Sequence, residues 1–216
     1  MRAKTSATAT RLQSDPVEAR RLAAAARDYL ALALALLQPA PPRLVAVGGW
    51  SGSGKSTLAR RLAPDIGSAP GAVLLRSDVL RKTLCGVHPT TRLGADAYER
   101  PVTDRVYRLL AEQAAAALRA GHSVMLDAVF GDPGERMTLA EVARAAGVPF
   151  TGLWLEAPTG VLTSRVEHRG LDASDATVDI LQRQTTRGTG PLDWARVDAS
   201  GDPDDLHRRA ERLLRP

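Results

Sequence analysis

The sequence of 216 residues has one cysteine, Cys85, and aromatic residues make up only 4% of it. A single cysteine excludes an internal disulfide framework and a cysteine-rich zinc module. No apolar run reaches the roughly 18 residues that are needed to cross a bilayer, and the longest, residues 29–37, is too short. We therefore expect a cytoplasmic protein that has no membrane-spanning segment.

Lysine is also scarce, because only Lys4, Lys55 and Lys82 stand among the 29 basic residues. The net charge is +5, and such basicity could indicate nucleic-acid binding. Residues 1–42 hold six basic and three acidic residues, whereas residues 43–216 hold 23 basic and 21 acidic ones. Because the larger part carries a net charge of only +2, it lacks the positive excess that follows a nucleic-acid backbone, and we do not expect a nucleic-acid partner.

The first 42 residues divide into three pieces. Residues 1–14 show no periodic apolar pattern, which predicts disorder. Asp15 and Pro16 are typical of a helix start, and apolar residues then recur at helical spacing as far as residue 37. This helix presents one apolar stripe that could dock a partner. The proline-rich residues 39–42 predict a short stiff spacer before a domain at 43–216.

From residue 43 onward, short apolar strands alternate with helical stretches, which is typical of an α/β fold with a parallel sheet. We expect five strands, at about residues 44–48, 72–76, 123–127, 150–155 and 194–198. Pro133, after a possible Asp132 cap, predicts a helix start.

The strongest motif satisfies the phosphate-loop pattern G-x-x-x-x-G-K-[ST] in full, between an apolar strand and a helix. Glycines let the backbone turn its N–H groups toward phosphates, and the following helix adds its positive end. The motif predicts a nucleotide-binding site, with Lys55 also acting in catalysis by reaching the β- and γ-phosphates. The predicted nucleotide-binding residues are Gly49, Ser51, Gly52, Ser53, Gly54, Lys55, Ser56 and Thr57.

A carboxylate at the end of the third strand, Asp127, is a candidate Mg²⁺ ligand together with the Ser56 hydroxyl. An Asp that merely caps the following loop would look the same in the sequence. The next residue is Ala128, so the glutamate that activates water in hydrolytic members of this fold is missing. This favours transfer of a phosphoryl group to a substrate over ATP hydrolysis.

On the acceptor side, Asp78 and Arg81 lie three residues apart at the start of a predicted helix. A carboxylate there could orient a hydroxyl and accept its proton, and a guanidinium could hold the substrate. A helix start with an acidic first turn and a solvated arginine fits the same residues. Arg136 is a further candidate for the acceptor pocket, although an exposed first-turn arginine explains it equally well.

The segment 165–187 is a candidate lid. Arg165 and Arg169 flank a helix end, and a second arginine-rich helix follows. Arginines on such a flap could neutralise developing charge and exclude water, which would make both residues catalytic. A solvated, arginine-rich helix face is the alternative.

Taken together, these segments resemble the P-loop small-molecule kinases, a group that includes gluconate and shikimate kinases, chloramphenicol phosphotransferase, polynucleotide kinase and zeta toxins. The sequence is most similar to the AAA-type ATP-binding module often fused behind an aminoglycoside-phosphotransferase-like domain, although 42 preceding residues are too few to form that domain. The resemblance covers about residues 43–200. It implies a three-layer P-loop sandwich with a five-stranded parallel sheet, ATP with Mg²⁺, Asp78 as base and the arginines of the flap as lid. The segments that carry it are residues 49–57, 75–82, 124–128, 153–158 and 165–169.

The leading hypothesis is a kinase that transfers the γ-phosphate of ATP to a hydroxyl of a small molecule, such as a sugar, sugar acid, nucleoside or antibiotic. One alternative is 5′-hydroxyl phosphorylation of a polynucleotide, which needs a basic track. The other is a nucleotide-dependent regulatory module that binds a partner through the helix at 15–37 and phosphorylates no acceptor.

Overall fold

The computed structural model describes residues 1–37, 39–168 and 173–215. The chain divides into two compact units, Met1–Ala40 and Pro41–Pro216. The first unit is a pair of neighbouring helices, α1 (Arg2–Leu12) and α2 (Pro16–Leu37). At the start of α2, the Asp15 carboxylate accepts a hydrogen bond from the Val17 N–H, as the sequence predicts for a helix cap.

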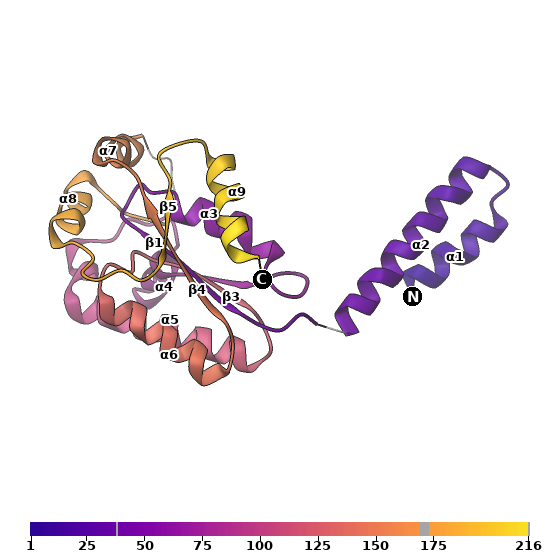
Figure 1. Cartoon of the computed structure of the whole chain (residues 1–216), viewed down its shortest axis with the longest axis horizontal. Coiled ribbons are helices and arrows are strands. Elements are labelled where there is room, and N and C mark those ends of the chain that lie inside the picture. The colour runs from indigo at the N-terminus through magenta and orange to yellow at the C-terminus, as the bar shows by residue number, and fades with distance from the viewer. Residues whose placement is uncertain (38, 169–172, 216) are drawn as a thin grey trace. The chain divides into compact units, whose positions relative to one another are not determined.

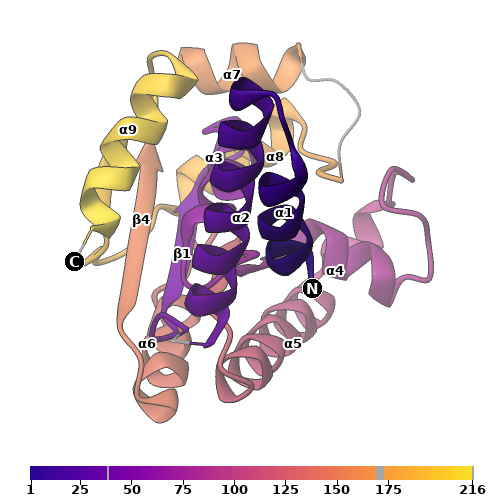
Figure 2. The same cartoon turned by 90° about the vertical axis from the view of Figure 1, so that its right-hand side faces the viewer.

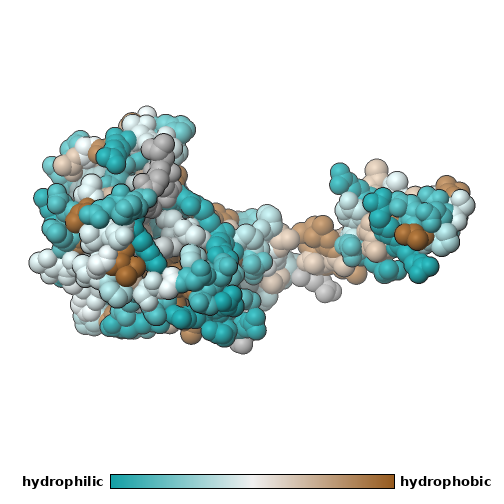
Figure 3. Space-filling model, turned by 90° about the horizontal axis from the view of Figure 1, so that it is seen from above, coloured by the Kyte–Doolittle hydropathy of each residue, from teal (hydrophilic) through white to brown (hydrophobic). Residues whose placement is uncertain are grey.

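Helix α1 differs from our expectation that residues 1–14 are disordered. Its residues include alanine, leucine, arginine and lysine, which have high helix propensity, and it lies against α2. Neither helix contains a buried residue, and large apolar side chains of α2, among them Leu30, Leu34 and Leu37, stay exposed. Brown patches on this unit in Figure 3 show such exposed apolar surface. Within the described residues, no helix is both long enough and apolar enough to span a membrane.

The second unit is a five-stranded, entirely parallel sheet with strand order β2-β3-β1-β4-β5. The strands are β1 (Leu44–Gly49), β2 (Val73–Arg76), β3 (Val124–Asp127), β4 (Phe150–Glu156) and β5 (Ala195–Asp198). All five lie where the sequence predicts them. Every residue of β1 and β3 is buried, as expected of central strands with both faces covered.

Helices cover both faces of the sheet, which confirms the three-layer α/β fold (Figure 1). Alternate residues of β1 point to opposite faces: Val45 and Val47 pack with α3 (Lys55–Leu62) and α9 (Pro203–Leu214), and Leu44 and Ala46 pack with α5 (Arg100–Arg119) and α6 (Pro133–Ala146).

The remaining helices gather near the carboxyl ends of the strands, where ligands bind in open α/β sheets. Helices α7 (Thr159–Glu167) and α8 (Val178–Arg187) pack on each other through Leu162, Val166 and Leu181. In Figure 2 the arrow of β4 points toward α7. Helix α4 (Ser77–Leu84) follows β2 directly, and two short 3-10 segments, η1 (Ala63–Asp65) and η2 (Ala95–Tyr98), complete the unit. The face of this unit seen in Figure 3 is largely hydrophilic.

Candidate active site

One cavity of about 570 Å³ lies at the carboxyl ends of the strands and contains most of the predicted site residues. The phosphate loop forms one part of its wall, between the end of β1 and the start of α3. Lining residues from this loop are Trp50, Ser51, Gly52, Gly54, Lys55, Ser56 and Thr57. Gly49 and Ser53 belong to the same loop but do not line the cavity.

Two glycines make the loop possible. Gly52 has a φ of +84°, and a Cβ there would lie 2.5 Å from the carbonyl oxygen of Leu162. Gly49 has a φ of +139°, and its Cβ would lie 2.7 Å from the carbonyl oxygen of Leu155. Both positions therefore require glycine for backbone conformation and for space, so the loop is held against β4 and α7. The side chain of Ser53, in the same loop, is completely buried and lies beside Gly49.

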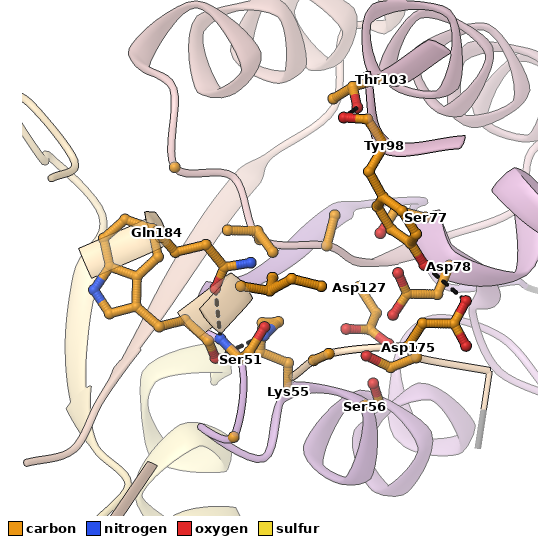
Figure 4. Close-up of a pocket in the computed structure, with 18 of the residues that line it drawn as sticks. Ser51, Lys55, Ser56, Ser77, Asp78, Tyr98, Thr103, Asp127, Asp175 and Gln184 are labelled. Atoms are coloured by element: carbon orange, nitrogen blue, oxygen red, sulfur yellow. Dashed lines mark hydrogen bonds between the residues drawn. The ribbon is translucent and has the colours of Figure 1, made fainter. Parts of the chain in front are cut away.

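Lys55 and Ser56 open helix α3 and face the cavity (Figure 4). The Lys55 ammonium donates a hydrogen bond to the carbonyl oxygen of Trp50, at 2.9 Å. The amide of Ser51 donates to the Gln184 side chain at 3.0 Å, which connects the loop to α8. Gln184 lies in the segment that the sequence predicts as a lid, but no local pattern indicates which of its side chains contacts the loop.

Asp127 ends β3 and also faces the cavity, where it is only 4% exposed. Its Oδ2 atom lies 3.0 Å from Nε of Arg76, which is its register partner on β2. The sheet itself thus holds this carboxylate in place beside the phosphate loop. Among the described residues, no group of three or more His, Cys, Asp and Glu side chains could hold a metal by itself.

Mg²⁺ does not need such a group, because it usually keeps several waters and uses one or two carboxylates with substrate phosphates. Ser56 and Asp127 supply one hydroxyl and one carboxylate in the same cavity. These oxygen donors fit the ion's chemistry, with phosphates and water as the remaining ligands.

Asp78 lies across the cavity from the phosphate loop, in the first turn of α4 (Figure 4). Burial raises the pKa of this carboxyl, and the nearby Asp127 carboxylate raises it further, while Lys55 opposes this shift. The Ser174 side chain forms a hydrogen bond with Asp78. The structure therefore brings Asp78 together with the nucleotide-side residues that the sequence predicts.

Arg81 lines the same cavity but is largely engaged by the protein. It is 5% exposed, and its Nη1 atom donates to the Ala97 carbonyl oxygen at 2.6 Å and to Thr103 Oγ1 at 3.3 Å. Its guanidinium also lies 4.7 Å from the centre of the Tyr98 ring. Arg81 thus holds η2 against α5 at one wall of the cavity.

Arg136 differs from its predicted place in the acceptor pocket, because it does not line the cavity. Arg136 is a buried residue of α6. Its guanidinium donates to three carbonyl oxygens at 2.6–2.7 Å, those of Phe130, Thr189 and Pro191. A charged group can be buried when hydrogen bonds replace its water. Arg136 therefore fastens the loop after β3 to the segment after α8.

The predicted lid arginines are found in different settings. Arg165 lines the cavity, and its guanidinium donates to the carbonyl oxygens of Ala199, Ser200 and Gly201 in the loop after β5. Arg183 and Arg187 of α8 line the cavity as well. Arg169 lies outside the described residues.

Several lining residues were not predicted from the sequence. Tyr98, Tyr107, Glu135 and Asp175 all face the cavity. Burial raises the pKa of Glu135 to about 7, and the neighbouring Asp132 carboxylate adds to this shift. Glu135 stands three residues after the Asp132 cap of α6 and completes a capping box. That spacing was a usable local signal for the box, whereas nothing local connects Asp175 or the two tyrosines to the site.

Comparison with known proteins assigns the chain to a family. A family model described as an AAA domain matches residues 44–191, and the chain belongs to this family. An uncharacterized protein from Mycobacterium tuberculosis (strain H37Rv) is 34% identical over 187 residues, which cover 83% of this chain and 36% of the relative. The chain thus spans about a third of the length of such curated relatives. Adenylyl-sulfate kinase from Myxococcus xanthus is 32% identical over 117 residues, covering 54% of this chain and 59% of that protein.

Solved structures show the same fold. A sugar kinase from Janibacter sp., in its unliganded state, is 25% identical, has a TM-score of 0.57 and covers 81% of this chain and 95% of its own. The APS kinase of Mycobacterium tuberculosis, in complex with AMPPNP and APS, is 22% identical with a TM-score of 0.58, and the match covers 81% of this chain and 98% of that one. The chain has the α/β fold of the P-loop kinases, and its neighbours in structure are small-molecule kinases.

Proposed function

We propose that the protein is a kinase that transfers the γ-phosphate of ATP to a hydroxyl group of a small molecule. The observation that carries the proposal is a single cavity with a complete phosphate loop on one wall and the buried carboxylate of Asp78 on the other. A phosphoryl transferase needs a nucleotide and an acceptor side by side, with water kept out.

On the nucleotide side, the backbone N–H groups of the loop and the start of α3 would surround the phosphates. Lys55 would leave the Trp50 carbonyl and contact the β- and γ-phosphates. Ser56 and Asp127 would hold Mg²⁺, which neutralises phosphate charge when bound. The structure of a similarly folded APS kinase in complex with AMPPNP supports the binding of a nucleotide.

On the acceptor side, Asp78 would accept a hydrogen bond from the acceptor hydroxyl and orient its oxygen toward the γ-phosphorus. As the new O–P bond forms, the bond between the γ-phosphorus and the oxygen that bridges it to the β-phosphate breaks, and ADP leaves. The hydroxyl proton passes late to the Asp78 carboxylate. A raised pKa suits this role, because it makes Asp78 a better proton acceptor than an exposed aspartate.

Arginines would complete the charge balance. Arg165, Arg183 and Arg187 line the cavity from α7 and α8 and could offset the charge that develops on the transferred group. We also propose this role for Arg169, as the flap motif implies. The lid between residues 165 and 187 would then supply positive charge and exclude water.

The acceptor class remains broad, since neighbours with this fold include a sugar kinase and an APS kinase. The test is a panel of sugars, sugar acids, nucleosides and aminoglycosides, each incubated with ATP and Mg²⁺ while ADP release is followed. We expect one class to raise ADP release and to yield a phosphorylated product by mass spectrometry. Tight ATP binding without phosphorylation of any acceptor would instead favour a regulatory module and overturn the proposal.

A further inference from the structure

The acceptor side contains a buried ion pair that the reaction described above does not use. Lys82 on α4 is fully buried, and its Nζ atom lies 2.9 Å from Oδ1 of Asp175. The exposed fractions of the two side chains are 1% and 8%. A buried ammonium is costly unless it is paired and hydrogen bonded. The position of this lysine, one of only three in the chain, therefore depends on its partners.

The pair joins helix α4 and the residues that directly follow it to a segment that is distant in the sequence. Lys82 Nζ also donates to the carbonyl oxygen of Thr91 at 2.6 Å. The second carboxylate oxygen of Asp175 accepts hydrogen bonds from the Leu93 N–H at 3.1 Å and from the Tyr98 hydroxyl at 2.8 Å. Helix α4, residues 84–100 (the acceptor insert) and the segment at 173–176 therefore meet at one carboxylate.

This meeting point adjoins the proposed base. Ser174, next to Asp175, forms a hydrogen bond with Asp78, and Asp78 lies one turn before Lys82 on α4. Asp78, Tyr98, Ser174 and Asp175 line the same cavity, and Figure 4 shows the Tyr98 hydroxyl directed at Asp175 beside Asp78. A shift of the pair would move both the wall of the acceptor site and a hydrogen-bond partner of Asp78.

We propose that Lys82 and Asp175 are positioning residues that assemble the acceptor subsite, by joining the acceptor insert and residues 173–176 to helix α4 around Asp78. The inference rests on the proposed kinase function and deepens it. The pair does not touch reacting atoms in this scheme. It fixes where the acceptor wall stands relative to Asp78, whereas the phosphate loop is built without it.

The experiment compares Lys82→Met, Asp175→Asn and the double variant with the wild type. The Leu93 amide, which donates to Asp175, reports on the pair by hydrogen exchange and needs no acceptor. We expect faster exchange at Leu93 in all three variants and unchanged protection in β1 and α3. ADP affinity, followed by tryptophan fluorescence, should stay at the wild-type value.

With the acceptor found in the panel, kcat/KM for that acceptor should fall by about 10²-fold, since small displacements of a reacting group have effects of this size. The double variant should lose no more than either single one, because each change breaks the same contact. Glu211→Gln is the matched control: it breaks an exposed ion pair with Arg215 of the same 2.9 Å length and should change nothing.

The outcomes distinguish failure of the proposed kinase function from failure of the positioning role. If the wild type phosphorylates no acceptor, the proposed function fails. If the wild type does phosphorylate an acceptor, two results for Lys82→Met would overturn the positioning role alone. One is an unchanged kcat/KM for the acceptor, and the other is a loss of ADP affinity as large as the loss of kcat/KM. Unchanged exchange at Leu93 would overturn it as well, independently of any acceptor.

Discussion

The two walls of the central cavity are built in different ways. The wall that we propose for the nucleotide comes from consecutive residues, 49–57, and depends mainly on backbone conformation: glycines at positive φ and the first turn of α3. The wall that we propose for the acceptor is held by side chains from distant segments, and its central contact joins residues 93 positions apart. The first wall is thus a local property of the chain, whereas the second depends on the complete fold.

This difference implies that the two walls should fail separately. Changes in the loop should affect the nucleotide first, and changes in the side-chain contacts should affect the acceptor or the stability first.

Lys55→Ala should have the largest effect on activity, because it removes the one side-chain cation that the loop sequence itself supplies. We expect kcat/KM for ATP to fall by about 10³-fold, as for the loss of a preorganised donor to developing charge. ADP release in the presence of the acceptor measures this. Lys4→Ala, at an exposed lysine of α1, is the matched control. Activity within a few-fold of the wild type would mean that the backbone alone holds the phosphates.

Arg136→Met should lower the free energy of unfolding without altering which acceptor is used. The variant leaves the carbonyl oxygens of Phe130, Thr189 and Pro191 without their donor. Unpaired buried groups of this kind cost about 1–3 kcal/mol each, so we expect a total loss of about 3 kcal/mol after partial hydration. Urea denaturation measures it, with the exposed Arg144→Met on the same helix as control. A stable variant that loses acceptor affinity would return Arg136 to the substrate site.

Asp78→Asn should lower phosphoryl transfer by about 10²-fold, the lower end of the usual contribution of a general base. The substitution keeps the shape of the side chain and the neighbouring phosphate loop, so ADP affinity should not decrease. Steady-state kinetics and nucleotide titration distinguish the two effects, and Asp104→Asn on the surface of α5 is the control. Equal transfer by the variant would remove Asp78 from its role.

Much of the fold and one wall of the site were predictable from the sequence, for a physical reason. Strands such as Leu44–Gly49 are uniformly apolar because both faces of a parallel sheet are covered, and the loop after it follows from glycine and lysine spacing. These signals lie within a few residues of the structures that they specify. The register of β2 and β3 then brings Arg76 to Asp127, a pairing that requires the strand order, which local patterns do not contain.

The contacts of the wall opposite the phosphate loop could not be predicted, because they join residues that are far apart in the sequence. Arg136 looked equally suited to a surface or a pocket, because its three carbonyl partners come from segments on either side of it in the sequence. Lys82 and Asp175 each resemble ordinary charged residues until the fold brings them together. Helix α1 could not be predicted from an apolar stripe, because residues 1–14 have none. It follows instead from residue propensity and from contact with α2.

Glu135→Gln should produce the smallest effect and tests whether the cavity contains a carboxyl that titrates near neutral pH. The pKa of Glu135, about 7 in the folded protein, exceeds the value of about 4.3 expected in an unfolded chain. Between these two values the folded state holds a proton that the unfolded state has released. The contribution of Glu135 to the free energy of unfolding is therefore fully present below the lower value and is lost as the pH rises through 7.

Glutamine keeps the oxygen that accepts from the Asp132 N–H in the capping box, so the fold should persist while the titration disappears. We expect the wild type to lose more free energy of unfolding than the variant between pH 5 and pH 8, by on the order of 1 kcal/mol, because Glu135 is only partly buried and water reduces the effect. Urea denaturation at both pH values measures this difference. Glu141→Gln, exposed on the same helix, should behave as the wild type. Parallel pH profiles for the wild type and Glu135→Gln would show that this carboxyl is charged at neutral pH, so that the cavity would carry one more negative charge.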